Sequence, residues 1–356
     1  MGKKKIRVGV IGLGSIGPFH IDGILKSPDL ELGALCDLKS DRLEEKRKLY
    51  DLSADKCFKS YTEMMDSGKI DAVSICTPND VHYEMAMEAV KRNMPYALEK
   101  PVCNSASEAK KLMDITKEKN IPNMVCFSYR FIPAARYARE IVLSGDLGRI
   151  YHINCDYLQS WGLPHVNTKR EWRFHAKEAG TGVIGDLGTH MYDMFRFLTG
   201  KEFTRLTADY DTIISERPLV DNPSMMGIVD IDDYVNIAGQ MDGKIAVYMA
   251  ITRFAYSRGN YQRIEVYGDK GAVSYTREYS YPDGKLHINM GSKPMEKSHI
   301  WVEIPVPDSY ESSQMQSFAD LINGCGDGLA PTIEDGYYAQ VFIDKAVEAG
   351  KIAIKF

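Results

Sequence analysis

The segment ALEKPVC, residues 97–103, places a lysine between a glutamate and a proline. Steric clash with a proline ring drives the preceding residue out of the helical region, so Lys100 is predicted to lie on an extended piece or a turn. Burial in a partly dry site lowers the pKa of an amine, and such a lysine can hydrogen-bond a hydroxyl or accept its proton. The alternative is an ordinary lysine at a strand end that points into water.

The segment GTGVIGDLGTHMYDMF, residues 180–195, holds a second group of ionisable side chains. Asp186 and His190 are four residues apart, so they share one face if the segment is helical. A carboxylate and an imidazole on one face can hold a hydroxyl and accept its proton. Plainer interpretations are Asp186 as a helix cap and His190 as a core histidine, and Asp193 is predicted to be structural. A metal site of His175, Asp186 and His190 is an alternative, but no His-Glu-x-x-His motif or Cys/His cluster supports it, and no metal is predicted.

The segment VGVIGLGSIGPFH carries a Gly-x-Gly-x-x-Gly pattern directly after an apolar run. In a strand-turn-helix context, Gly12 permits the tight turn, Gly14 lets a pyrophosphate approach the backbone, and Gly17 allows close packing of helix on strand. The following helix N-terminus offers free N–H groups and a positive dipole end to phosphates. An ordinary glycine turn is the alternative. The predicted phosphate-binding residues are Gly12, Gly14, Ser15, Ile16 and Gly17.

Asp37 ends the second apolar run and stands about 20 residues after the last of these glycines. A carboxylate at that place accepts hydrogen bonds from the 2′-hydroxyl of an adenine ribose and repels a 2′-phosphate. The prediction is therefore NAD rather than NADP, although Lys39 and Arg42 nearby weaken the preference. A helix cap or a solvated turn is the alternative role for Asp37.

The elements that must position these residues alternate in the first third of the chain. Short apolar runs are separated by amphipathic segments, which predicts an α/β fold with an open parallel sheet and helices on both faces. Ligands of such sheets bind beyond the carboxyl ends of the strands, where ALEKP and CTPNDVH both lie, so Lys100 is predicted to lie over the cofactor. The predicted strands are 6–11, 31–37, 70–76, 95–99 and 123–129, and the predicted helices run to about Leu25 and over 41–50, 81–93 and 105–120.

From about residue 150 the pattern changes to alternating strands with hairpin turns. Turns are predicted at Asp242-Gly243, between Gly268 and Gly271, and at Asp283-Gly284, which indicates a mostly antiparallel sheet. The domain prediction is a dinucleotide-binding Rossmann domain over 1–128 and a substrate-binding and oligomerisation domain over 129–356. Helices are expected near 133–144, 186–198, 311–324 and 334–349, and the last of these could pack back on the first domain.

Bulk properties exclude several classes of protein. The 356 residues suit two domains, and a net charge of −5 argues against nucleic-acid binding. Seven scattered cysteines without a Cys-x-x-Cys pair fit reduced thiols in a cytoplasmic protein. MGKKKIRVGVIG is interpreted as a solvated end that leads into a strand, not as a secretory signal. No stretch approaches the roughly 18 apolar residues of a membrane span, so no membrane partner is expected.

Taken together, these segments resemble the Gfo/Idh/MocA oxidoreductases over almost the whole chain. The resemblance rests on VGVIGLGSIG, CTPNDVHYEMAMEAV, ALEKPV, SYRFIPAARYAREIV, EWRF, GTGVIGDLGTHMYD and GDKGAV, in this order. One departure is that the glycine run before the family's aspartate, often three glycines, here reads Gly180-Thr181-Gly182. The resemblance implies homodimers or homotetramers that associate through the open antiparallel sheet, and often a cis peptide before Pro101.

The resemblance also implies roles for individual residues. Lys100, Asp186 and His190 would form the catalytic group. Cofactor contacts are implied for Thr77, Asn79, His82 and Glu99, and Trp172 and Arg173 are implied at the nicotinamide end. We favour His190 as the immediate base, Asp186 as its orienting partner and Lys100 as the stabiliser of the oxyanion. The assignment of Lys100 as the base stays open, because coupled groups resist single assignment.

The expected activity is NAD-dependent oxidation of a secondary ring hydroxyl of a sugar, a glycoside at C3, or a cyclitol. Aromatic and amide side chains after residue 156 suit a pyranose, and Tyr157, Gln159, Trp161 and His165 are the predicted substrate contacts. The alternative for the tryptophans is a place in the core or an interface. Alternative functions are inositol or anhydrosugar dehydrogenase, a glycosidase that uses NAD redox chemistry, and a non-catalytic nucleotide-binding regulator.

Overall fold

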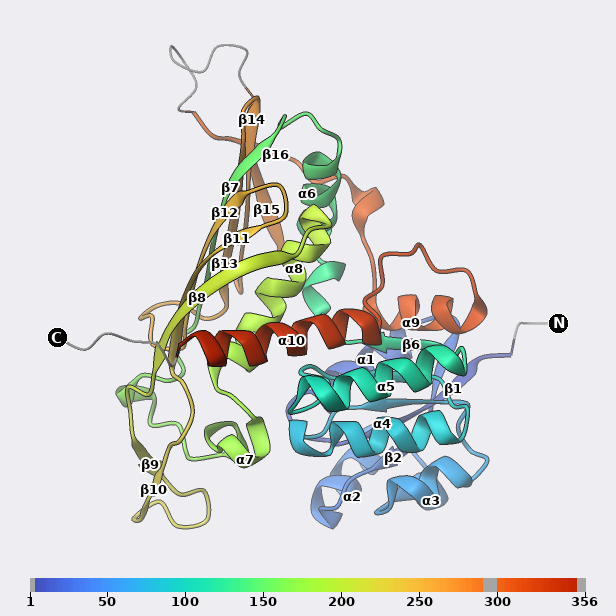
Figure 1. Cartoon of the computed structure of the whole chain (residues 1–356). Coiled ribbons are helices and arrows are strands. Elements are labelled where there is room, and N and C mark those ends of the chain that lie inside the picture. The colour runs from blue at the N-terminus through green and yellow to red at the C-terminus, as the bar shows by residue number, and fades with distance from the viewer. Residues whose placement is uncertain (1–3, 291–299, 351–356) are drawn as a thin grey trace. The chain divides into compact units, whose positions relative to one another are not determined.

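The computed structural model describes residues 4–290 and 300–350, which divide into two compact units (Figure 1). The first unit combines the residues up to Ser128 with Ser312–Gln340. The second unit combines Tyr129–Glu311 with the residues from Val341 onward. Helix α10 (Ile333–Ala349) therefore contributes its first half to one unit and its second half to the other.

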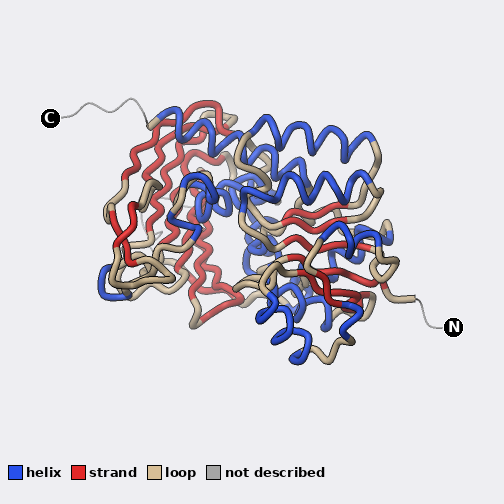
Figure 2. Tube along the Cα trace, turned by 90° about the horizontal axis from the view of Figure 1, so that it is seen from below, coloured by secondary structure: helices blue, strands red, loops and turns tan. Residues whose placement is uncertain are grey.

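The first unit is built on a parallel sheet, as predicted. Its strands are almost continuously apolar and buried, as expected for a sheet covered on both faces. Figure 2 shows helices on both sides of these strands. In the described residues the sheet has six strands in the order β3-β2-β1-β4-β5-β6. They are β1 (Ile6–Ile11), β2 (Leu30–Cys36), β3 (Cys57–Phe58), β4 (Ala72–Ile75), β5 (Tyr96–Leu98) and β6 (Asn123–Val125).

The helices of the first unit follow the predicted segments, and the unit contains one further helix and one further strand. Ser105 caps α5, because its hydroxyl accepts the Glu108 N–H. Strand β3 and helix α3 were not predicted, because both are too short to show a period. The helices are α1 (Gly17–Lys26), α2 (Ser40–Leu49), α3 (Tyr61–Asp66), α4 (His82–Lys91), α5 (Ala106–Glu118) and α9 (Gln314–Asn323).

Helix α9 groups with the first unit, whereas the sequence assigned all of 129–356 to the second domain. The physical reason is close packing on α1. The Ser27 hydroxyl donates to Gln316 Oε1 at 2.6 Å, and Gln316 Nε2 donates to Asp29 Oδ2 at 2.9 Å. A Cβ at Gly23 of α1 would lie 2.8 Å from Met315 Cγ, so the glycine permits this approach.

The second unit is built on a large, mostly antiparallel sheet, as predicted. Strands β7 and β12 form one parallel pair, and the other neighbours in the described residues are antiparallel. The order is β16-β15-β14-β13-β7-β12-β11-β8. These strands are β7 (Ile150–Leu158), β8 (Phe203–Asp211), β11 (Tyr234–Met241), β12 (Ile245–Thr252), β13 (Tyr261–Gly268), β14 (Gly271–Glu278), β15 (Tyr281–Met290) and β16 (Val302–Ile304).

Two of the three predicted hairpin turns are confirmed, and the third is wrong. Turns join β11 to β12 around Gly243 and β13 to β14 between Gly268 and Gly271. Asp283-Gly284 lies inside β15 instead, and the chain reverses at Tyr279 and Ser280. Gly284 has a φ of +77° and the β14–β15 register shifts next to it, so the glycine serves a bulge rather than a turn.

Helices α6 (Pro133–Leu143) and α8 (Thr189–Thr199) lie on the same face of this sheet (Figure 1). Inward strand residues such as Ile153, Met249 and Ile264 are buried under them. Smaller elements of the unit are α7 (Ala176–Ala179), β9 (Glu216–Pro218) and β10 (Met226–Ile228). Among the described residues, the helices all fall short of the length and apolar character that a bilayer crossing demands.

Candidate active site

The glycine turn between β1 and α1 has the shape that a dinucleotide needs. Gly12 has a φ of +88°, and a Cβ there would lie 2.6 Å from the Cys76 carbonyl oxygen. A Cβ at Gly17 would lie 2.3 Å from the Gly12 carbonyl oxygen. Gly14 is different, because a Cβ would find only Arg42 Nη1 within 4 Å, at 3.9 Å. The turn is therefore closed toward the protein and open at Gly14, where a pyrophosphate would approach.

Asp37 follows β2 and lies beside this turn. Its Oδ2 accepts the Leu13 N–H at 2.9 Å, and its Oδ1 accepts the Lys39 N–H at 2.8 Å. Arg42 Nη1 lies 3.3 Å from Oδ2. The Asp37 carboxylate thus stabilises the glycine turn through the Leu13 N–H. The positive Arg42 guanidinium lies next to the position expected for the ribose. Both features fit an adenosine ribose at this edge of the sheet.

The loops after β4 and β5 are tied together by His82. This imidazole is fully buried, with Nδ1 2.7 Å from the Pro101 carbonyl oxygen and Nε2 2.8 Å from the Thr77 carbonyl oxygen. Burial lowers the pKa of His82, while the two carbonyls act in the opposite direction. The His82 ring fixes the two loops relative to each other. Its contribution to cofactor binding would therefore be indirect, through the position of these loops. Thr77 is half-buried and Asn79 is buried in the same loop.

Lys100 lies directly after β5, on a turn that continues through a cis peptide to Pro101. Glu99 fixes the start of this turn. The Glu99 N–H donates to the Ile75 carbonyl oxygen at 3.0 Å, and Glu99 Oε2 accepts the Lys100 N–H at 3.2 Å. The turn is thereby anchored to the end of β4, its neighbour in the sheet. The extended or turn geometry predicted for Lys100 is confirmed.

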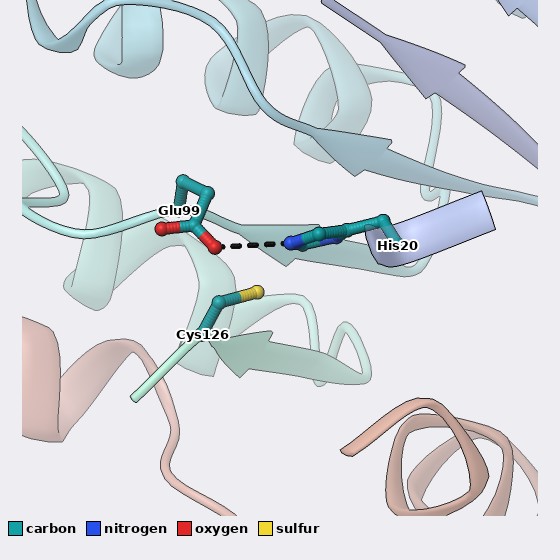
Figure 3. Close-up of side chains that lie close together, drawn as sticks. All are labelled: His20, Glu99 and Cys126. Carbon is teal, nitrogen blue, oxygen red and sulfur yellow. Dashed lines mark hydrogen bonds and ion pairs between the residues drawn. The ribbon is translucent and has the colours of Figure 1, made fainter. Parts of the chain in front are cut away.

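The other Glu99 oxygen contacts His20 of α1 (Figure 3). His20 Nε2 lies 3.0 Å from Glu99 Oε1, and His20 Nδ1 lies 2.7 Å from the Ser74 hydroxyl. Burial lowers the pKa of His20, but Cys76 and Glu99 outweigh it and raise the pKa to about 10. Burial raises the pKa of Glu99, but His20 and Lys100 outweigh it and leave the pKa below its usual value. A buried ion pair therefore lies directly behind Lys100.

Cys126, after β6, lies beside this pair in Figure 3. Potential metal-ligand atoms of His20, Glu99 and Cys126 lie within 4.8 Å of one another. Among the described residues, these three form the group of His, Cys, Asp or Glu side chains that is close enough to hold a metal ion. Burial raises the pKa of the Cys126 thiol well above its usual value. The alternative trio of His175, Asp186 and His190 does not form such a group in the part of the chain that the structure describes.

In the second unit, Asp186 lies on a π-helical turn (Ile184–Gly188) that leads into α8. Asp232 holds this turn, because its carboxylate accepts the N–H of Gly182 at 2.6 Å and of Ile184 at 2.8 Å. A Cβ at Gly182 would lie 1.8 Å from the Asp232 carbonyl oxygen. The glycine at 182 is therefore needed.

His190 lies on the first turn of α8 and is buried. Its ring centroid is 4.5 Å from that of Tyr129 and 6.5 Å from that of Tyr157. The two phenol oxygens are 2.5 Å apart, and the Tyr157 hydroxyl donates to Asn260 Oδ1 at 2.7 Å. Burial, reinforced by Tyr129 and Asp186, raises the pKa of Tyr157 well above its usual value. Asp186 and His190 thus share their surroundings with the hydroxyls of Tyr129 and Tyr157.

The other predicted substrate contacts extend from this network. Gln159 Nε2 donates to Asn260 Oδ1 at 2.8 Å, and Trp161 Nε1 donates to Gln159 Oε1 at 2.5 Å. The Trp161 ring also packs edge-on against Phe174 and carries Arg253 over one face at 4.9 Å, so the core interpretation holds for part of this ring. His165 is exposed.

Trp172 and Arg173 are half-buried and contact each other. The Arg173 guanidinium lies 4.3 Å from the centroid of the Trp172 ring. Asp193 has the structural role predicted for it, in a buried ion pair with Arg130 through two contacts of 2.8 and 2.5 Å.

Several residues that shape the site escaped the sequence analysis. His20 stands three residues after Gly17 in the quoted motif, but its partners Ser74 and Glu99 are 54 and 79 residues away. Asn260 and Tyr129 come together only in the folded sheet, and no local spacing marks them. Homologous sequences would be the signal that could find such residues.

Comparison with known proteins decides the family. Residues 6–127 match the oxidoreductase family with an NAD-binding Rossmann fold, and residues 135–274 match the GFO/IDH/MocA C-terminal domain. The chain belongs to the GFO/IDH/MocA oxidoreductase family. The resemblance noted from the sequence motifs is confirmed. The first matched range contains the strands of the parallel sheet, and the second lies in the part of the chain that forms the mostly antiparallel sheet.

Individual relatives are dehydrogenases of sugars and inositols. Levoglucosan dehydrogenase of Pseudarthrobacter phenanthrenivorans is 30% identical over 317 residues, which cover 81% of this chain and 80% of the relative. Myo-inositol 2-dehydrogenase of Thermotoga maritima is 27% identical and covers 94% of this chain and 93% of the relative. A solved structure of levoglucosan dehydrogenase with NADH and L-sorbose has a TM-score of 0.88 at 27% identity, over 98% of this chain and 97% of that one.

These findings confirm the reaction class and the cofactor. This GFO/IDH/MocA member is an NAD-dependent oxidoreductase of the sugar, inositol and levoglucosan dehydrogenase type, which acts on CH–OH groups. The glycine turn and Asp37 would hold NAD, which supplies the hydride acceptor when bound. The loops of the first unit bring Lys100 to the same edge of the sheet as that turn.

Proposed function

We propose that this enzyme oxidises a secondary ring hydroxyl of an anhydrosugar or glycoside to a ketone, at C3 of the ring. The observation that carries the proposal is that Lys100, Asp186 and His190 are all retained in a chain whose relatives are sugar and inositol dehydrogenases. A non-catalytic regulator has no need of this set of ionisable groups. The cofactor accepts the hydride from the ring carbon, and the hydroxyl proton goes to a protein base.

The proposed roles follow from the chemistry of each side chain. His190 accepts the hydroxyl proton, Asp186 orients the imidazole or binds a neighbouring hydroxyl, and Lys100 stabilises the developing oxyanion. The exchange of roles between Lys100 and His190 remains the alternative, because coupled groups titrate as a set. Tyr157 beside His190 supports this proposal, since its raised pKa keeps it a hydroxyl donor without negative charge.

The proposed substrate class rests on the polar network around Asn260. Gln159 and Trp161 form its outer end and are half-buried, so an amide and an indole edge are available to a sugar ring. Levoglucosan, the substrate named by one relative, is an anhydrosugar, which supports an anhydrosugar or glycoside as the substrate. The inositol relative supports a cyclitol as the alternative substrate.

The test is the absorbance of reduced nicotinamide, followed with purified enzyme, NAD and a panel of levoglucosan, aryl glucosides, free hexoses and inositols. The proposal expects NADH with an anhydrosugar or glycoside and a 3-keto product. NADH with inositols alone would move the assignment to the cyclitol alternative. Cleavage of an aryl glucoside with NAD returned unchanged would contradict the dehydrogenase proposal and indicate a redox glycosidase.

We further propose that the enzyme is a homo-oligomer that associates through the face of the eight-stranded sheet opposite α6 and α8. Outward residues on this face include Ala238 and Tyr248, which are exposed, and Asn154, which is half-buried. Tyr248 pairs with Ala238 on one side and with Asn154 on the other, so the patch is continuous across three strands. These three residues form an uncharged patch, while charged residues such as Arg263 and Glu265 lie on the neighbouring strand β13. We propose that the uncharged patch packs against a second copy of the chain.

A further inference from the structure

The buried pair of His20 and Glu99 links three segments of the first unit (Figure 3). His20 belongs to α1, the helix that follows the glycine turn, and is 3% exposed. Ser74 belongs to β4, and Glu99 starts the turn after β5 that carries Lys100. No local sequence signal predicts this pair, and neither the glycine motif nor the proposed proton transfer requires an imidazole at residue 20.

We propose that His20 is a positioning residue, which as an imidazolium fixes the Glu99 carboxylate so that Glu99 holds the Lys100 turn against the dinucleotide helix. This inference rests on the proposed function in one respect, which is the role of Lys100 in the reaction. Each step of the linkage is a contact within one unit, from Ser74 to His20, from His20 to Glu99, and from Glu99 to the Lys100 N–H.

The contact with the Glu99 carboxylate favours the doubly protonated ring, because an opposite charge at 3.0 Å stabilises an imidazolium. Nε2–H donates to Glu99 Oε1, and Nδ1 lies 2.7 Å from the Ser74 hydroxyl, which can donate or accept. A neutral ring protonated at Nε2 would keep both contacts but would lack the charge that stabilises the carboxylate. The raised pKa of His20, about 10, agrees with this arrangement.

The charge of the ring matters because Glu99 is nearly buried. Its side chain is 15% exposed, and an isolated carboxylate there would take up a proton to avoid desolvation. A neutral carboxyl would accept the Lys100 N–H more weakly than the carboxylate does. The charge of His20 therefore keeps Glu99 a strong acceptor. A shift of about 1 Å in a positioned catalytic group costs about 10²-fold in rate.

A metal ion is the competing explanation for His20, Glu99 and Cys126. The direct contact of 3.0 Å between His20 and Glu99 uses the nitrogen that a cation would need. The positioning role accounts for the pair without an ion.

The experiment compares His20→Gln, His20→Ala and Glu99→Gln with Tyr96→Phe as the matched control. The glutamine variant keeps an amide donor near the position of Nε2 but no charge, and the alanine variant keeps neither. Tyr96→Phe removes a buried hydrogen bond of the same β5 strand, from the Tyr96 hydroxyl to Thr116 at 2.9 Å, without touching the turn. We measure kcat with saturating NAD across pH, the Kd of NADH, and deuterium exchange of the peptide that spans residues 96–103.

We expect kcat to fall about 10²-fold in His20→Ala and less in His20→Gln, with far smaller changes in the Kd of NADH. His20→Gln should also gain an acid limb in its kcat profile, as Glu99 becomes protonated. Exchange at 96–103 should quicken in His20→Ala and not in Tyr96→Phe. Wild-type kcat and pH profile in His20→Ala, or an equal loss in Tyr96→Phe, would overturn the proposal.

Two measurements need no variant and no turnover. The ¹⁵N shifts of His20 in the wild-type protein should report an imidazolium at pH 8, and a neutral ring there would overturn the proposal. A stoichiometric divalent metal in the purified protein that is ligated by His20 and Glu99 would also overturn it. If the wild-type enzyme oxidises no compound of the panel, the proposed function fails, and the exchange and NMR results then judge the positioning role alone.

Discussion

At the scale of single residues, the chemistry of the site depends on how buried charges are paired. Glu99 and Asp37 are both placed by backbone N–H donors and by one cation each, His20 and Arg42. A carboxylate that is held by such hydrogen bonds keeps a fixed direction. The positions of the residues that contact substrate or cofactor therefore depend on these buried pairs, which hold the turns that carry them.

Lys100→Ala should reduce kcat by at least about 10²-fold, because an ammonium that stabilises the oxyanion or relays its proton is lost. NAD binding should be retained, since the glycine turn and Asp37 are untouched. The measurement is NADH formation together with the Kd of NAD. Lys100→Arg separates the two roles, because arginine keeps the charge but does not give up its proton. Full activity in Lys100→Ala would disprove the catalytic assignment.

Asp37→Asn should weaken NAD binding and strengthen NADP binding. The change removes the charge that repels a 2′-phosphate, and it releases Arg42 from its 3.3 Å contact with Oδ2. Asparagine keeps one acceptor for the Leu13 N–H, so the glycine turn should persist. Dissociation constants for both cofactors check the prediction. The double change with Arg42→Gln is the control, and it should lose the gain for NADP.

His20 also predicts a pH dependence of stability. Its pKa of about 10 in the folded chain exceeds the value of about 6.5 in an unfolded chain, so the folded state holds an extra proton between these pH values. The stabilisation by His20 is complete below about pH 6.5 and is lost as the pH rises toward 10. Urea unfolding of wild type and His20→Gln should show a stability difference that shrinks over this range. A constant difference would contradict it.

At the scale of elements, local motifs were predictable and long-range ones were not. The glycine turn follows from three residues within six positions, and the Ser105 cap from one serine before a helix. Asp283-Gly284 shows the limit of such rules, because the same dipeptide serves a turn or a bulge according to the partner strand. The π-helical turn of Asp186 depends on Asp232, nearly fifty residues further along, and no spacing reveals that.

Gly182→Ala tests how this π-helical turn is held. Its Cβ would lie 1.8 Å from a backbone oxygen of Asp232, which does not move as a flexible side chain would. We expect a loss of about 2 kcal/mol or more in stability and a fall in kcat as Asp186 shifts. Gly188→Ala in the same turn is the matched control, because its Cβ would meet atoms at 3.5 Å or beyond. Equal urea midpoints for the two variants would argue against this account.

At the scale of the whole molecule, sequence order does not fix which unit a segment joins. The antiparallel pattern predicted the second unit, yet α9 lies beyond it in sequence and groups with the first. Gln316 and Met315 make this contact with α1, and their own neighbours in sequence carry no sign of it. The parallel pairing of β7 with β12 could not be predicted from the sequence either. The two strands are nearly ninety residues apart, and their alternation of apolar and polar residues is the same as that of any half-buried strand.

The open face of the eight-stranded sheet supplies the last prediction. Tyr248 of β12 is 45% exposed on that face, between the neighbouring strands β7 and β11. Tyr248→Arg places a charge where a second copy of the chain would exclude water, and an unpaired buried charge is costly. Light scattering after size exclusion should show a smaller assembly than the wild type. Tyr279→Arg is the control, since Tyr279 is 68% exposed at a hairpin turn away from this face. An unchanged mass in Tyr248→Arg, or the same loss in Tyr279→Arg, would place the contact between subunits elsewhere.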